Sequence, residues 1–297
     1  MKPRLLPYVA ASVTGIQVGA ALVASEAIVD DIGPAGLGFW RYLIASAVLI
    51  PFWITSKHVR VARHHIFPIS LIGFGQFGVL IALLNVAVLL AASSRVSFVF
   101  ATLPFATLAF ERLIFHNRMG LKEVYAIVIS FVGIAFLIGA DLYAETIARS
   151  EGIGLLAALA ATLTGAICSI FLRPYVRRYG AVQVSLLAML ASLIPLGMMA
   201  SLETQGHLMA NLSGLNTIIV VSIGLSSGIG FWCWLYALSH APAGHVTAFL
   251  GLSPVTAVIL SIAMDREPLT ISVLAALLLV IGALSFLIFP STANSRT

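Results

Sequence analysis

The sequence contains little charge. Only 9% of its 297 residues are Asp, Glu, Lys or Arg, whereas a soluble domain carries roughly 25%. Cysteine is also scarce: Cys168 and Cys233 both lie in apolar runs, which excludes a disulfide framework and a metal-ligand spacing. Hydrophobic residues make up 60% of the chain, more than one soluble globule can bury. The composition therefore predicts a membrane protein.

Ten long apolar runs fill almost the whole chain. About twenty apolar residues cross the hydrocarbon core of a bilayer as a helix. Each run is about twice the length of a barrel strand and apolar on all faces, which predicts an all-α integral membrane protein. The predicted spans are Leu5–Ala27, Pro34–Ile54, Ile66–Leu90, Val96–Phe115, Leu121–Ala140, Ile153–Leu172, Ala181–Leu202, Leu215–Leu238, Val246–Met264 and Leu269–Phe289.

Basic and acidic loops alternate along the chain, and this alternation predicts the orientation. Cytoplasmic loops carry an excess of Lys and Arg. With both termini in the cytoplasm, 12 of the 16 Lys and Arg residues lie inside and 9 of the 11 acids lie outside. The basic residues sit at helix ends and form no continuous stripe, so nucleic-acid binding is not expected. We expect a multi-pass protein of a bacterial inner membrane, as a monomer or weak dimer in contact with membrane lipid.

The two halves of the sequence, residues 1–145 and 146–297, are similar at an offset of 150 residues. Pro104 then aligns with Pro254, Gly78 with Gly228, and the order of spans and loops also matches. Each half has five spans, an odd number, so the second half must enter the membrane upside down. The sequence thus predicts ten transmembrane helices as two inverted five-helix repeats, a layout typical of secondary transporters.

Several short motifs lie in the spans and at the joints between them: residues 39–42, 85–88 continuing to Val96, Pro104, 152–157, 234–243, 252–255 and 267–269. As a set they resemble the drug/metabolite transporter superfamily, and within it the EamA-type ten-span exporters. The resemblance implies alternating-access export of small metabolites, amino acids among them, through a central cavity between the halves. The family often has a Trp-Gly pair in span one, where this sequence has Thr14-Gly15 and Gln17.

Pro104 and Pro254 lie near the centres of spans four and nine. Proline removes one helix hydrogen bond and clashes with the preceding turn, and in lipid the freed backbone groups need a neighbouring helix or a water-filled cavity. We interpret both prolines as hinges or broken helices beside the transport path. A tolerated static kink is the alternative.

Polar and aromatic side chains inside the spans are candidates for substrate binding. Gln17, Gln76 and Asn85 need hydrogen-bond partners when buried, and they either bind substrate or join helices. In span eight, Trp232 and Tyr236 follow Gly228 at four-residue spacing, on one helix face. They either line the pocket or pack at the interface.

Three charged or titratable groups near helix ends are candidate gates. Arg41 and Arg95 lie near outer ends, where they either extend to lipid headgroups or form an outer gate with Glu26, Asp30 or Asp31. His245 opens span nine on the cytoplasmic side and is a candidate inner gate.

No acidic or basic residue lies near the middle of any predicted span. This absence leaves proton coupling without support and disfavours phosphate-bearing substrates. We therefore expect a small neutral or zwitterionic substrate, and amino acids are the first candidates for export. A lipid-carrier flippase, a drug or nucleoside exporter and a non-transporting scaffold are the alternatives. A membrane enzyme would need a nucleophile–base set or a metal cluster, so neither catalysis nor a cofactor is expected.

Overall fold

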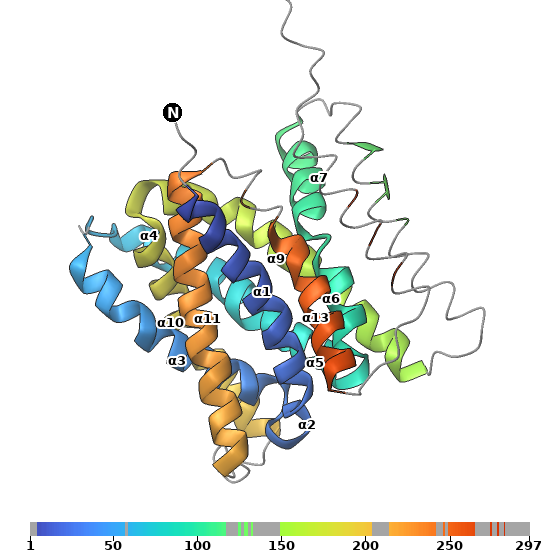
Figure 1. The fold of residues 1–297 in the computed structure, drawn as a ribbon. Helices are drawn as coiled ribbons and strands as arrows, with labels where there is room; N and C mark the ends of the chain where they lie inside the picture. The colour runs from blue at the N-terminus through green and yellow to red at the C-terminus, as the bar shows by residue number, and fades with distance from the viewer. Residues whose placement is uncertain are drawn as a thin grey trace, which may run out of the picture.

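A computed structural model describes residues 5–56, 59–116, 149–203, 214–241 and 249–264, with 124–125, 128–129, 132, 246, 274, 278 and 282. Within this part of the chain, the regular elements are helices (Figure 1). They are α1 (Leu6–Glu26), α2 (Val29–Ile32), α3 (Pro34–Thr55), α4 (Arg63–Gly73), η1 (Phe74–Val79), α5 (Leu80–Leu90), α6 (Ser93–Phe100), α7 (Leu103–Phe115), α9 (Arg149–Tyr179), α10 (Ala181–Glu203), α11 (Gly214–His240), η2 (Phe249–Gly251) and α13 (Leu252–Ala263).

Seven helical stretches in the described residues are long and apolar enough to cross a membrane. They match predicted spans one to four, seven and eight within a few residues, whereas α9 covers predicted span six and extends past its predicted end at Leu172 to Tyr179. The third stretch joins α4, η1 and α5, and the fourth joins α6 and α7. Predicted span nine corresponds to the shorter stretch Phe249–Ala263. Predicted spans five and ten lie almost entirely outside the described residues.

The helix α1 packs against the C-terminal part of the chain. It lies beside α11 and α13 (Figure 1). Thr14 Oγ1 donates a 2.9 Å hydrogen bond to the Gly230 carbonyl, and Gln17 contacts Ser227. Because the residue numbers rise on α1 as they fall on α11, the two helices are antiparallel. Along α13 the numbers rise together with those of α1, from Gly15 near Phe249 to Gly19 near Ser253, so these helices are parallel.

The helix α9 packs in the opposite sense, against the N-terminal part. Gly154 lies next to Ala91 near one end of α5, and Gly165 lies next to Leu80 at the other end, so α9 and α5 are antiparallel. Along α6 and α7 the numbers rise together: Thr162 contacts the Val99 carbonyl and Arg173 binds Glu111. The helix α9 is therefore parallel to α6 and α7.

Helices α3 and α11 run parallel and in close contact. The two glycines Gly224 and Gly228 meet Ile44 and Val48 of α3, and a Cβ added to either glycine would lie 2.6 or 2.7 Å from the facing Cβ. Small residues at this spacing let two helix backbones approach closely. This glycine pair therefore serves helix packing.

A carboxylate from α10 caps the start of α3. Glu203 Oε2 accepts hydrogen bonds from the backbone N–H groups of Ala35 (2.9 Å) and Gly36 (3.2 Å). The first N–H groups of a helix have no partner within the helix, and its positive dipole end favours an anion. Gly33 precedes this turn with φ +82°, and a Cβ there would meet the same carboxylate.

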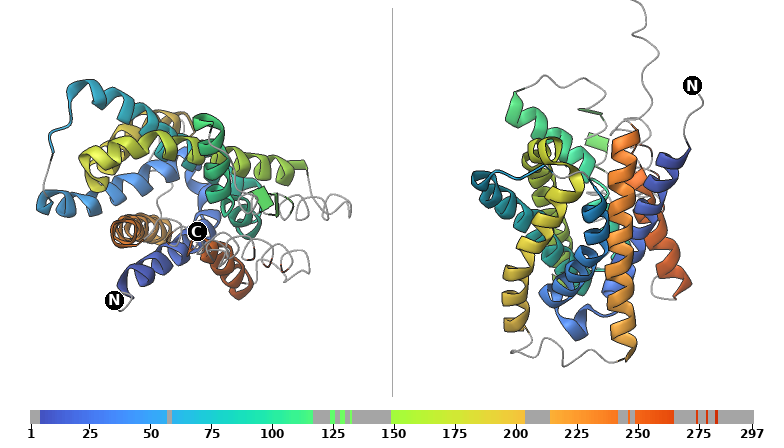
Figure 2. Two further views of the ribbon diagram at one scale, coloured as in Figure 1. Left: turned by 90° about the horizontal axis from the view of Figure 1, so that it is seen from above. Right: turned by 90° about the vertical axis from the view of Figure 1, so that its left-hand side faces the viewer.

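Figure 2 shows the helix bundle from two further directions. The charged residues gather at its two ends, with mostly basic residues at one end and mostly acidic residues at the other. One end, here the basic end, holds the start of α4, the end of α7 and the end of α9. The other, the acidic end, holds the end of α1, the start of α3 and the start of α9. The described basic-end residues with formal charge are Arg60, Arg63, Glu111, Arg112, Arg173, Arg177 and Arg178; those at the acidic end are Glu26, Asp30, Asp31, Arg41, Arg95, Arg149, Glu151 and Glu203.

Candidate functional site

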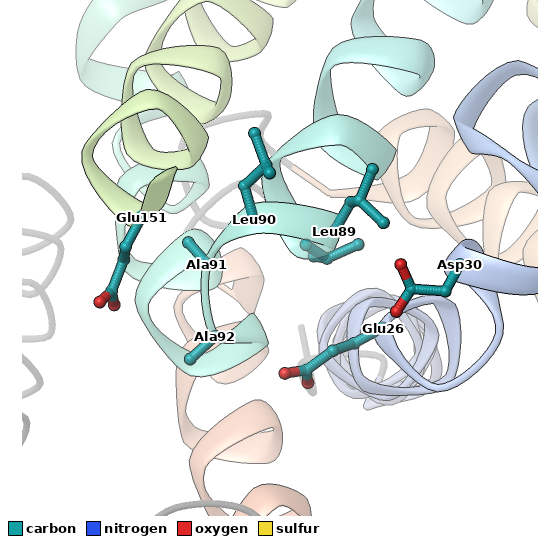
Figure 3. A pocket seen from close by; sticks show the side chains of 8 residues that line it. Glu26, Asp30, Leu89, Leu90, Ala91, Ala92 and Glu151 are labelled. Atoms are coloured by element: carbon teal, nitrogen blue, oxygen red, sulfur yellow. The ribbon is translucent and has the colours of Figure 1, made fainter. Parts of the chain in front are cut away.

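A pocket of about 540 Å³ opens at the acidic end, between α1, α2, the end of α5 and the start of α9. Figure 3 shows the carboxylates of Glu26 and Asp30 on one side of the segment Leu89–Ala92 and that of Glu151 on the other. This lining favours a solute that carries a positive charge or hydrogen-bond donors.

An ion pair closes one side of this pocket. Arg95 Nη1 lies 2.6 Å from Glu151 Oε1, and the two side chains are 19% and 18% exposed. Arg95 belongs to the first turn of α6 and Glu151 to the first turn of α9. The sequence left two interpretations of Arg95, extension to lipid headgroups or an outer gate with Glu26, Asp30 or Asp31. The structure pairs it with Glu151, because α9 starts beside α6.

Both candidate hinge prolines lie in the first turn of a helix, directly after a change in backbone structure. The α6 helix ends at Phe100, Ala101 and Thr102 form a turn, and Pro104 is the second residue of α7. Pro254 is the third residue of α13, after the short 3-10 turn η2. A proline in the first turn of a helix loses no internal hydrogen bond. In the described residues, span four is thus interrupted between α6 and α7, and a 3-10 turn precedes α13 in span nine. The hinge role of both prolines stays a prediction.

Gln17 and Gln76 each contact a hydroxyl on a helix from the other part of the chain. Gln17 Nε2 donates to Ser227 Oγ at 3.4 Å, and Ser169 Oγ donates to Gln76 Oε1 at 3.3 Å. Gln76 lies in η1, a π-helical segment, and such segments occur frequently at functional sites. The two contacts join α1 to α11 and η1 to α9.

Two other candidate residues, Asn85 and Trp232, lie at helix–helix contacts, and Tyr236 stacks on Trp232 within α11. Asn85 is 1% exposed, and its Nδ2 donates to the Pro34 carbonyl at 2.8 Å, which joins α5 to the start of α3. Trp232 stacks on Phe52 of α3 at 5.0 Å and on Tyr236 at 5.8 Å. Both Asn85 and Trp232 therefore stabilise helix contacts in this structure, and their role in substrate binding stays a prediction.

The candidate gates differ in how the structure places them. Arg41 lies in the second turn of α3 at the acidic end, and its buried Nε has no hydrogen-bond partner among the described residues. His245 lies outside the described residues.

Sequence reasoning missed Glu151, Ser169 and Ser227 as partners of the chosen side chains. Glu151 directly precedes the glycine of the motif at 152–157, and that position at a span boundary was the available signal. The two serines gave no such signal, because a hydroxyl inside a span commonly bonds its own helix.

Comparison with known proteins extends over nearly the whole chain. The protein is 27% identical to the uncharacterized transporter YdfC of Bacillus subtilis over 232 residues, which are 77% of this chain and 73% of that relative. It is 24% identical over 260 residues to an uncharacterized transporter of Archaeoglobus fulgidus, covering 86% and 89% of the two chains. The B. subtilis transporter YyaM is 21% identical over 279 residues, covering 91% and 90%.

One solved crystal structure superposes on this protein with a TM-score of 0.62 and 18% sequence identity. The superposition covers 94% of this chain and 96% of the chain in that structure. At that identity the likeness shows a shared fold. The sequence model of the EamA-like transporter family matches two stretches, residues 5–139 and 152–289. The chain is thus a multi-pass membrane protein that belongs to the EamA-like transporter family.

Proposed function

We propose that this protein exports small neutral or zwitterionic metabolites by alternating access, with amino acids as the preferred class. The observation that carries this proposal is a reciprocal packing of α1 and α9, each against helices from the other part of the chain. The helix α1 packs antiparallel to α11 and parallel to α13, while α9 packs antiparallel to α5 and parallel to α6 and α7. Each of these two helices therefore packs against the other part of the chain in the same relative directions.

This reciprocity supports two inverted five-helix repeats, residues 1–145 and 146–297, and ten spans. The family model also matches twice, once in each half. In addition, α7 and α9 run parallel, so α7 ends at the basic end and α9 begins at the acidic end. The chain between Phe115 and Arg149 connects opposite ends of the bundle, which supports a crossing there. Repeats related in this way can rock about a site between them.

Both termini are cytoplasmic in this proposal, with the basic end in the cytoplasm according to the positive-inside rule. The protein resides in a bacterial inner membrane, and the acidic-end pocket faces outward. Accessibility of tags fused to each terminus, measured in intact cells and in permeabilised cells, tests this orientation. Tags that are accessible from opposite sides would contradict it, since ten spans return the chain to its starting side.

The substrate class follows from the polar groups that the structure brings together. The carboxylates of Glu26 and Asp30 can attract an ammonium group at the pocket, beside Glu151, which pairs with Arg95. The amides of Gln17 and Gln76 offer donors and acceptors farther along the bundle. The described spans place no formal charge at mid-depth for a phosphate, which favours a neutral or zwitterionic solute over a sugar phosphate.

Counterflow into proteoliposomes tests this function. Vesicles preloaded with an unlabelled solute should accumulate the labelled form when they contain the protein, first for neutral amino acids and not for sugar phosphates. Gln17→Ala and Gln76→Ala should raise KM several-fold, while Ser201→Ala, at an exposed hydroxyl of α10, should match wild type. Counterflow of nucleosides or drugs but of no amino acid would overturn the substrate class. Absence of counterflow for the whole panel would overturn the transport proposal.

A further inference from the structure

A group of aromatic and basic side chains lies at the basic end, where the start of α4 meets the end of α9. We call it the basic–aromatic cluster; its residues are Arg63, His64, His65, Tyr175, Arg178 and Tyr179. It lies at the end of the bundle opposite to the acidic-end pocket and takes no part in the pocket described above.

The cluster is held together by aromatic contacts around His65. Its Nδ1 and Tyr179 Oη share a 2.6 Å hydrogen bond, and its ring centre lies 5.3 Å from that of Tyr175. The His64 ring lies 4.0 Å from the His65 ring. The Arg178 guanidinium carbon lies 5.4 Å from the centre of the Tyr179 ring, a cation–π distance. These contacts fix the relative positions of α4 and α9.

The positive charges of this cluster lack acidic partners in the described residues. Arg63, His64 and Arg178 are exposed, and neither arginine forms an ion pair within the described part of the chain. At the basic end Glu111 is the described carboxylate, and it binds Arg173 at 2.7 Å. The cluster therefore presents an excess of positive charge that an anion from outside the chain can neutralise.

Exposed apolar side chains continue from these charges toward the middle of the membrane. On α4, Phe67 and Leu71 follow Arg63 at four-residue intervals and are 74% and 58% exposed. On α9, Phe171 lies two turns before Arg178 and is 48% exposed. Residues at these spacings share one helix face. Each helix thus offers a cation at its end with an apolar surface beside it.

We propose that the basic–aromatic cluster binds the phosphate headgroup of an anionic phospholipid, whose acyl chains lie against the exposed apolar faces of α4 and α9. Arginine forms paired, charge-assisted hydrogen bonds to phosphate oxygens. Basic pockets between membrane helices on the cytoplasmic side are suited to anionic lipid headgroups. A soluble anion would gain nothing from Phe67, Leu71 and Phe171, so the apolar surface favours a lipid.

Lipid binding at this place has a consequence for transport, which rests on the proposed function. The cluster connects α4 with α9. It therefore connects the two parts of the chain that move relative to each other during alternating access. A headgroup that bridges them stabilises the arrangement in which the start of α4 and the end of α9 are close. Anionic lipid should then change the rate of counterflow, whereas the binding itself can be measured without transport.

Native mass spectrometry of the full-length protein released from nanodiscs tests the binding. The nanodiscs contain phosphatidylethanolamine and phosphatidylglycerol in a 3:1 ratio, or phosphatidylethanolamine with phosphatidylcholine as the neutral reference. Each basic residue near an anionic surface contributes about five-fold to binding. The double variant Arg63→Gln/Arg178→Gln should therefore retain phosphatidylglycerol about thirty-fold less. Arg177→Gln is the control for the Arg178 half of this variant, because it removes one charge from the same turn of α9, one residue away.

Thermal unfolding in detergent supplies a second readout. Added phosphatidylglycerol should raise the unfolding temperature of wild type and of Arg177→Gln, and should leave that of the double variant unchanged. Equal retention by the double variant and wild type would overturn the proposal. An equal loss of bound phosphatidylglycerol in Arg177→Gln would also overturn the proposal, since the binding would then depend on the general surface charge and not on the cluster. Stabilisation by 10 mM inorganic phosphate equal to that by the lipid would identify a free-anion site instead.

Discussion

Arg95 and Glu151 form a 2.6 Å ion pair between the first turns of α6 and α9. The pair joins α6, in the first stretch that the family model matches, to the residue directly before the second stretch, and it borders the pocket lined by Glu26, Asp30 and Glu151. Each side chain is about one-fifth exposed, so solvent screens the pair less than a surface ion pair. In the orientation proposed above, the pair is a candidate for the outer gate, and this role stays a prediction.

A double-mutant cycle measures the strength of this pair. Arg95→Gln and Glu151→Gln should each lower the free energy of unfolding by about 1 kcal/mol, and the double variant should lose less than the sum. The Arg173–Glu111 pair, which is 49% and 32% exposed, is the matched control, with an expected coupling below about 0.5 kcal/mol. Chemical unfolding in mild detergent provides the measurement. Additive losses at Arg95 and Glu151 would show that the two charges do not interact.

The cap on α3 predicts a cost for removing one charge. Glu203→Gln keeps an acceptor for the Ala35 N–H but loses the interaction of the carboxylate with the helix dipole. We expect a loss of about 1 kcal/mol in the free energy of unfolding. The same experiment with Glu111→Gln, at an exposed ion pair, should give a smaller loss. A stable Glu203→Gln variant would mean that Gln caps the helix equally well.

Close packing of α1 on α13 predicts that Gly19→Ala is destabilising. A Cβ at Gly19 would overlap the Ser253 carbonyl oxygen, which belongs to the backbone and cannot rotate away. Overpacking of this kind costs about 1–3 kcal/mol. Gly152→Ala is the control, since nothing lies within 4 Å of its Cβ position in α9. Thermal unfolding should separate the two variants, and equal unfolding temperatures would contradict the observed contact.

The broken helices predict a change in transport kinetics. Pro104→Ala and Pro254→Ala restore a backbone N–H donor beside each interruption, which lets the helix continue more regularly. If the two breaks act as hinges, the counterflow rate should fall several-fold while KM stays within about two-fold of wild type. Pro51→Ala, in the exposed part of α3, serves as the control. Wild-type rates in both variants would exclude the hinge role and leave a static kink.

The sequence predicted the helices well because a membrane span must satisfy its backbone hydrogen bonds internally. The runs at Pro34–Ile54 and Ala181–Leu202 became α3 and α10 with nearly the predicted bounds. Pro104 correctly marked a break, since proline cannot continue a helix without losing a bond. Bounds were less accurate at the end of α9, which continues past the predicted Leu172 to Tyr179 because polar residues can extend a helix beyond the hydrocarbon core.

The candidate site was less predictable, because a side chain's partner depends on which helices meet. Trp232 and Tyr236 were expected on one face, and they do stack on each other, but the contact with Phe52 came only from the parallel packing of α3 on α11. Glu203 lies at the end of its helix and gave no sequence signal for a cap on α3. Nothing in the sequence connects it with Ala35, 168 residues away.

Composition and spacing by themselves determined that this chain forms membrane-length helices and that its charges separate between two ends. The reason is that a chain in lipid must satisfy its backbone hydrogen bonds internally, and a helix does so. Only the tertiary structure decided the partners: Arg95 with Glu151, Gln17 with Ser227, His65 with Tyr179. Apolar helix faces are chemically alike and pack by shape, so the positions of small residues such as Gly19 and Gly228 select which helices approach. Those approaches then set which polar groups meet.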